Sequence, residues 1–123
     1  MALRRLLLAL TGLVAAMPGC GEKQDPAPSP GECDVTNAVS YAGDIRPLFE
    51  SYCLPCHSAT AADRQGAPAG LNFDTYAEAS ANAALANSVI QPGLMPPDFL
   101  GRAPTDGERC RFQAWVDAGA PDN

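Results

Sequence analysis

The sequence predicts an all-α fold built from three to four short helices. Three observations support this fold class. Residues 44–52 repeat apolar side chains at helical spacing, residues 74–86 are rich in alanine, and residues 105–118 begin with a helix-capping pattern. The chain contains 12 proline and 11 glycine residues, which favours loops over long regular elements. Its 123 residues are enough for one small domain.

The first two predicted helices are marked by periodicity and by caps. The first presents one apolar face, whose members at i, i+3, i+4 and i+7 are Ile45, Leu48, Phe49 and Tyr52. Asp44 is the expected N-cap, and Pro47 is tolerated in the first turn because its missing N–H would have no helical partner there. Asp74 or Thr75 is expected to cap the alanine-rich helix, which runs to about Ala86.

The last predicted helix has clear start and stop signals. Thr105 and Glu108 have the spacing of a capping box. The apolar residues that follow at i, i+3 and i+4 are Phe112, Trp115 and Val116. Gly119 and Pro121 then end the helix.

The first nineteen residues have the pattern of an export signal. Arg4 and Arg5 form a positive segment, and the apolar run that follows, residues 6–16, is too short for a transmembrane helix. The letters M-P-G-C, ending at Cys20, resemble the cleavage site of a bacterial lipoprotein, in which the cysteine is lipidated. We therefore predict a signal peptide at 1–19 and a lipid anchor on Cys20, facing the periplasm or the cell surface. Plain secretion and an uncleaved anchor are the alternatives.

Residues 20–37 are predicted to be a flexible tether, and residues 38–123 the folded domain. The stretch E-K-Q-D-P-A-P-S-P-G-E is polar, proline-rich and without periodicity. The formal net charge of the chain is −6, and its basic residues are scattered. This distribution argues against a nucleic-acid partner and suits a monomer that docks on a basic protein.

The segment Cys53-Leu54-Pro55-Cys56-His57 carries the chemistry. C-x-x-C-H is the attachment pattern of c-type haem. The two thiols add to the two vinyl groups on one edge of the porphyrin, and the adjacent His57 is carried to a position where it can ligate the iron. One alternative is a dithiol redox pair, although no βαβ pattern surrounds the motif. Another is a zinc site formed by Cys53, Cys56, His57 and one further cysteine.

Residues 41–121 resemble the cytochrome c superfamily. Phe49, four residues before Cys53, matches an aromatic residue in the N-terminal helix of that family, whereas Ile45 stands where the family often has glycine. The resemblance implies a cytochrome c fold, in which the helices surround one covalently bound haem and the C-terminal helix packs across the N-terminal one. It also implies an electron carrier that is not an enzyme and whose partners are redox proteins.

Met95 is the predicted sixth iron ligand. His57 is the only histidine, which excludes two histidine ligands within one chain, and the other methionines, Met1 and Met17, lie in the signal segment. In the family, a comparable loop brings a methionine to the distal face of the haem, often beside prolines. Here the neighbouring prolines are Pro92, Pro96 and Pro97. The alternatives are a methionine that fills a core gap, and a haem enzyme or gas sensor with an open sixth position.

The remaining cysteines predict a disulfide. The five cysteines are Cys20, Cys33, Cys53, Cys56 and Cys110. Lipidation uses one and the haem motif two, so Cys33 and Cys110 are left as a pair in an oxidising compartment. The alternatives are two reduced, buried cysteines, or a bond to another chain.

Several other residues are assigned to the core or to the surface. Leu71, Phe73 and Trp115 are expected in the haem crevice or the core. A buried Trp115 needs a partner for its indole N–H, and a haem propionate is one candidate. The arginines of the domain are expected on the solvated surface, with pairing to haem propionates as the alternative, and they are Arg46, Arg64, Arg102, Arg109 and Arg111.

Overall fold

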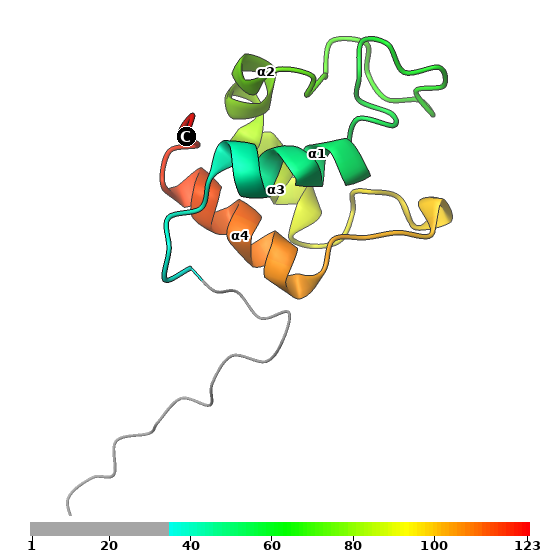
Figure 1. The fold of residues 1–123 in the computed structure, drawn as a ribbon. Helices are drawn as coiled ribbons and strands as arrows, with labels where there is room; N and C mark the ends of the chain where they lie inside the picture. Colours follow the sequence, from blue (N-terminus) through cyan, green and yellow to red (C-terminus); the bar gives the residue numbers. More distant parts are fainter. Residues whose placement is uncertain (1–34) are drawn as a thin grey trace, which may run out of the picture.

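The computed structural model describes residues 35–123, which form a small helical domain (Figure 1). Its elements in chain order are the π-helical turn η1 (Tyr41–Ile45), α1 (Arg46–Tyr52), α2 (Tyr76–Ala81), α3 (Ala83–Ile90), the 3₁₀ turn η2 (Asp98–Leu100) and α4 (Asp106–Asp117). Four α-helices and no strands are present in this part of the chain, which confirms the all-α prediction. The predicted signal peptide and residues 20–34 of the predicted tether lie outside the described residues.

The first helix begins earlier than predicted. Ser40 is extended (φ −92°, ψ 134°), and its Oγ accepts the Gly43 N–H at 3.1 Å. Asp44 instead accepts the Ser40 N–H at 2.9 Å through Oδ2. The expected N-cap, Asp44, was therefore wrong: it lies inside the first turn, and Ser40 is the cap. Pro47 does occupy the first turn of α1, as expected.

The predicted alanine-rich helix is divided into two. Thr75 caps α2 through a full capping box with Glu78, in which each residue accepts the backbone N–H of the other. The chain then leaves helical geometry at Asn82 (φ −108°, ψ 8°), whose side-chain Nδ2 donates to the Glu78 carbonyl at 2.9 Å. The backbone N–H of Asn82 still donates to the same carbonyl at 3.2 Å, but its φ and ψ interrupt the helix, so the prediction of one continuous helix was wrong. α3 restarts at Ala83 and runs on to Ile90.

The predicted signals of α4 are confirmed. Thr105 Oγ1 accepts the Glu108 N–H at 3.2 Å, and Glu108 Oε2 accepts the Thr105 N–H at 2.7 Å. Gly119 has a φ of +88°, which costs little without a Cβ, and its N–H donates to the Val116 carbonyl at 2.9 Å. Both ends of α4 are thus fixed by local contacts that the sequence encodes.

An aromatic cluster forms the centre of the domain. Phe49 of α1 stacks on Phe73 with ring centroids 4.8 Å apart and meets the edge of Phe112 of α4 at 5.5 Å. Trp115 is fully buried beside them. Its indole N–H donates to the Pro121 carbonyl at 3.0 Å, so the polar atom of this core residue is satisfied by the chain itself.

The C-terminal residue fastens the two ends of the domain together. Asn123 Oδ1 accepts the Tyr41 N–H at 2.8 Å, and its carbonyl oxygen accepts the Ala42 N–H at 3.1 Å. Figure 1 shows the C-terminus beside the start of the η1–α1 segment. Both η1 and α3 pack against α4. The bonds from Asn123 to η1 therefore help to hold the first helical segment in place over the last helix.

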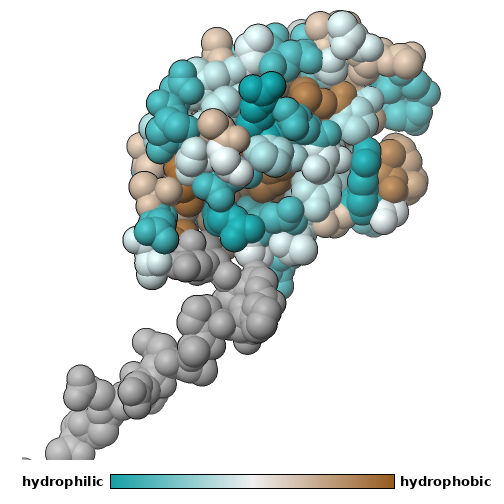
Figure 2. All heavy atoms as spheres, viewed as in Figure 1, coloured by the Kyte–Doolittle hydropathy of each residue, from teal (hydrophilic) through white to brown (hydrophobic). Residues whose placement is uncertain are grey.

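The surface seen in Figure 2 is mostly polar, with hydrophobic residues exposed only in small separate areas. The large hydrophobic residues that are exposed within residues 35–123 are Val35, Leu85, Leu94, Met95 and Phe99. No helix in this part of the chain is long and apolar enough to cross a membrane.

Phe112 should be essential to stability, because its side chain is fully buried against Phe49 and Trp115. We expect Phe112→Ala to lower the free energy of unfolding by about 3 to 5 kcal/mol, through lost burial and a residual cavity. Phe99, which is 68% exposed, is the matched control, and Phe99→Ala should change stability by no more than about 0.5 kcal/mol. Denaturant unfolding checks both values. Equal losses in the two variants would contradict this description of the core.

Candidate functional site

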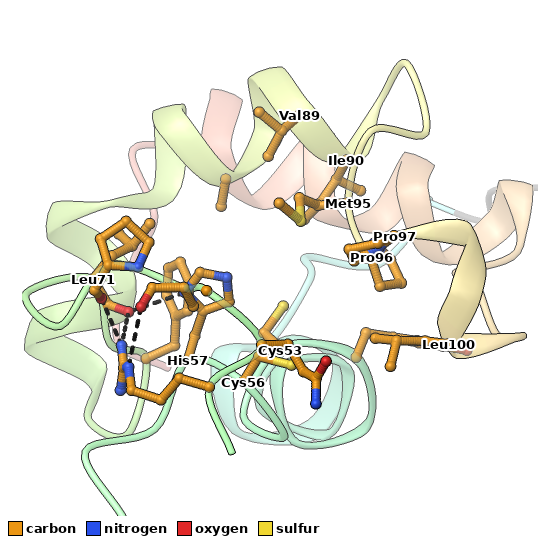
Figure 3. A pocket seen from close by; sticks show the side chains of 18 of the residues that line it. Cys53, Cys56, His57, Leu71, Val89, Ile90, Met95, Pro96, Pro97 and Leu100 are labelled. Carbon is orange, nitrogen blue, oxygen red and sulfur yellow. Dashed lines mark hydrogen bonds between the residues drawn. The ribbon is translucent and has the colours of Figure 1, made fainter. Parts of the chain in front are cut away.

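A cavity of about 310 Å³ lies between the segment that follows α1 and the segment formed by α3 and the loop after it (Figure 3). This volume is in the range of small-molecule and cofactor pockets. Most of its lining is apolar, and the apolar members are Ala67, Pro68, Leu71, Phe73, Leu85, Ala86, Val89, Ile90, Pro96, Pro97 and Leu100. The Cys53–His57 segment lies on one side, and Val89, Ile90 and Met95 lie on the other.

A tight turn at the end of α1 presents the motif. The Cys53 N–H donates to the Phe49 carbonyl at 2.9 Å and so completes the helix. The N–H groups of Cys56 and His57 then both donate to the Cys53 carbonyl, at 3.1 and 2.8 Å. Because the chain turns around this one carbonyl, two thiols and one imidazole line the same cavity.

Cys53 and Cys56 are free thiols. Burial first, and the neighbouring Cys56 second, raise the pKa of Cys53 to about 12. Cys53 is therefore protonated at neutral pH. Reactive redox cysteines have a lowered pKa, so this environment does not favour the alternative of a dithiol redox pair.

His57 is held by a backbone carbonyl. Its Nδ1 lies 3.0 Å from the Leu71 oxygen. A carbonyl oxygen can only accept, so Nδ1 carries a proton, and in the corresponding imidazole tautomer the lone pair lies on Nε2. The Phe73 N–H also donates to the His57 carbonyl at 2.9 Å, and the two rings meet edge to face at 5.5 Å. Metal-binding histidines are commonly oriented in this way by a bond from the other ring nitrogen.

Met95 reaches the same cavity from the loop after α3. The N–H groups of Leu94 and Met95 both donate to the Val89 carbonyl, at 2.9 and 3.1 Å, which folds the loop back over the end of α3. The Met95–Pro96 peptide bond is cis. Met95 is 39% exposed, so it does not fill a gap in the core. The structure thus brings together all four residues predicted for the site, namely Cys53, Cys56, His57 and Met95.

Among the cysteines that the structure describes, Cys110 does not line this cavity. Cys110, in α4, is disulfide-bonded. Its predicted partner, Cys33, lies outside the described residues, as does Cys20, so the Cys33–Cys110 pairing and the lipidation stay predictions. Within residues 35–123, no three His, Cys, Asp or Glu side chains lie close enough together to hold a metal ion. The predicted alternative of a zinc site therefore has no complete set of ligands within those residues.

Arg64 was assigned to the solvated surface, and this assignment was wrong. Its half-buried side chain lines the cavity and fastens the loop between the motif and α2. The acceptors of its guanidinium are Ser58 O (2.5 Å), Pro68 O (2.6 Å), Asn72 Oδ1 (2.9 Å), Ala67 O (3.3 Å) and Leu71 O (3.3 Å). No sequence signal marks this role, because four of the five acceptors are backbone carbonyls and every residue has one.

The same loop is closed a second time at its base. Asp74 accepts the Ser58 hydroxyl at 2.5 Å and the Ala59 N–H at 2.8 Å. These two hydrogen bonds, that from Ser58 first, lower the pKa of the Asp74 carboxyl. The closure fixes the residue next to His57, and so it supports the orientation of the imidazole.

No family model, curated protein or solved structure matches this chain. The inference of function therefore depends on the site itself. It offers two free thiols on one side, an imidazole oriented through its Nδ1 beside them, and a thioether on the opposite side of an apolar cavity.

Asp74 should make the stability of the domain sensitive to acid. Its pKa is lowered in the folded state, so its stabilisation is complete above its ordinary pKa of 3.8 and is lost as the pH falls through the lower, folded value. We expect Asp74→Asn to be less stable than the wild type at neutral pH, and the difference to shrink below about pH 4. Denaturant unfolding at a series of pH values measures this, with the exposed Asp98→Asn as control. A difference that stays constant with pH would contradict the role of Asp74.

Proposed function

We propose that this protein is an exported electron carrier that holds one covalently bound haem c with His57 and Met95 as its axial ligands. The observation that carries the proposal is the meeting of two thiols, an oriented imidazole and a thioether around one apolar cavity. Three of these groups come from five consecutive residues. The fourth, Met95, lies in a loop 38 positions after His57.

The residues present suit this group in both number and type. The thiols of Cys53 and Cys56 would add across the two vinyl groups of the porphyrin. The free Nε2 of His57 suits an iron ligand, because the Leu71 carbonyl already occupies Nδ1. The apolar lining of the cavity would gain from covering a porphyrin, since the chain is small and its own apolar core is limited.

A bound haem would supply a one-electron iron couple. His57 and Met95 would fill both axial positions, which leaves none for a substrate and favours electron transfer over catalysis. Methionine as the second ligand raises the reduction potential relative to other ligand sets. The prolines beside Met95, Pro96 and Pro97, restrict the loop backbone and help to keep the thioether on the cavity wall.

Met95→Ala tests the ligand set. The chain is to be produced with a cytochrome c maturation system, and the wild type is expected to show a low-spin haem spectrum that survives denaturation, because the attachment is covalent. Met95→Ala should retain the haem but give a high-spin or ligand-exchanged spectrum and a lower reduction potential.

Leu94→Ala is the matched control, because Leu94 is the exposed neighbour of Met95 and does not line the cavity. It should leave the spectrum and the potential unchanged. A wild-type protein without a Soret band would refute the haem proposal. A high-spin wild type would favour the haem enzyme or gas sensor with an open sixth position.

Lipidation of Cys20 would place this carrier on a membrane surface, with the acidic domain held outside the bilayer. We expect the wild type in the membrane fraction and a lipid-modified N-terminal cysteine by mass spectrometry. A lipoprotein cysteine carries two or three acyl chains, which is enough for stable anchoring. Cys20→Ser should abolish the modification and release the protein in soluble form. An unmodified Cys20 in a soluble wild type would leave plain secretion as the explanation.

A further inference from the structure

We propose that Arg64 is a positioning residue for His57, and that it favours the reduced form of the iron by sharing the Leu71 carbonyl with the imidazole. This inference rests on the proposed function, because it concerns the ligand properties of His57. It goes beyond that function by assigning control of the electron equilibrium to a residue that does not ligate the iron.

The carbonyl oxygen of Leu71 accepts two hydrogen bonds from the site. His57 Nδ1 donates to it at 3.0 Å, and Arg64 Nη2 donates to it at 3.3 Å. Figure 3 marks this group of bonds with dashed lines near Leu71 and His57. A second, charged donor draws electron density from the shared oxygen. The bond from His57 is therefore weaker than it would be to a carbonyl with one donor.

The strength of that bond controls how well the imidazole donates electrons. A strong acceptor at Nδ1–H gives the ring more anionic character and makes Nε2 a more basic ligand. More basic ligands stabilise the oxidised iron, which carries the higher charge. By weakening the acceptor, Arg64 makes His57 a poorer electron donor and shifts the equilibrium towards the reduced state.

The charge of Arg64 acts in the same direction. The guanidinium is a positively charged group, and the Arg64 side chain lines the cavity. All five of its hydrogen-bond acceptors are neutral oxygens. The ion pairs found in residues 35–123 are Arg46–Glu50 and Arg109–Asp106, and neither includes Arg64. A fixed positive charge at the cavity wall opposes the extra positive charge of the oxidised iron.

A purely structural role for Arg64 would give a different result. If it only fastened the loop, its loss would lower the stability of the fold and would not move the electron equilibrium of the protein that still folds and carries haem. The reduction potential of the haem-loaded protein therefore separates the two roles, whereas stability alone does not.

The test compares Arg64→Gln, Arg64→Lys and Arg46→Gln in haem-loaded protein. Arg46→Gln removes the same charge from an exposed ion pair that does not line the cavity. For Arg64→Gln, we expect the equilibrium constant for reduction to fall on the order of tenfold, the scale of one charge interaction near a protein surface. This equals a fall in potential of about 59 mV for one electron. Arg64→Lys keeps the charge and should fall less, by roughly threefold.

Arg46→Gln should leave the potential within the error of the measurement. The proposal is overturned if Arg64→Gln keeps the wild-type potential, or if Arg46→Gln lowers the potential as much. Should Arg64→Gln fail to yield haem-loaded protein, Arg64→Lys decides alone: a fall supports the proposal and an unchanged potential overturns it. Absence of haem from the wild type is a separate result, which refutes the proposed function itself.

A second readout observes the shared bond directly. In the reduced, diamagnetic protein, the Nδ1 proton of His57 gives its own NMR signal. We expect this signal to move downfield in the folded Arg64 variants, because a carbonyl with one donor accepts a stronger hydrogen bond. An unchanged signal together with a lowered potential would overturn the shared carbonyl as the cause.

Discussion

The whole site depends on the return of one loop to the residue from which it starts. The chain leaves the motif at His57 and comes back at Leu71 and Phe73, whose backbone groups bond to the ring and to the carbonyl of His57. These bonds hold the imidazole in one orientation. Arg64 and Asp74 close the same loop from inside and at its base. The direction of Nε2 is thus set by a loop that contains no helix. The orientation of the imidazole therefore depends on the polar contacts within that loop.

The domain divides its apolar surface between two sites. The first is the aromatic cluster of Phe49, Phe73, Phe112 and Trp115, which is closely packed and buried. The second is the cavity wall on α3 and the two loops, which the chain does not fill. Phe73 belongs to both, because it stacks on Phe49 and contacts the edge of His57. Phe73 therefore links the aromatic cluster directly to His57.

The sequence predicts the features whose signals are local. The capping box of α4, the apolar face of α1 and the C-x-x-C-H motif each lie within one or two helical turns, and the structure contains all of them. The errors have a different origin. Ser40 is the cap in place of Asp44, and its segment is held by Asn123 from the far end of the chain. Asn82, which separates α2 from α3, donates its side-chain amide to a backbone carbonyl, and Arg64 also binds backbone carbonyls. Such partners carry no residue-specific pattern.

Charge acts on two length scales in this protein. The net charge of −6 is spread over the chain, and at physiological salt the field of exposed charges falls off within about 8 Å. At the cavity this field is screened. Arg64 is half-buried, donates hydrogen bonds only to neutral acceptors and lies at the cavity wall, so its field is screened much less there. In the proposed carrier, docking would depend on the acidic surface, and the ligand properties of His57 on the positive charge of Arg64.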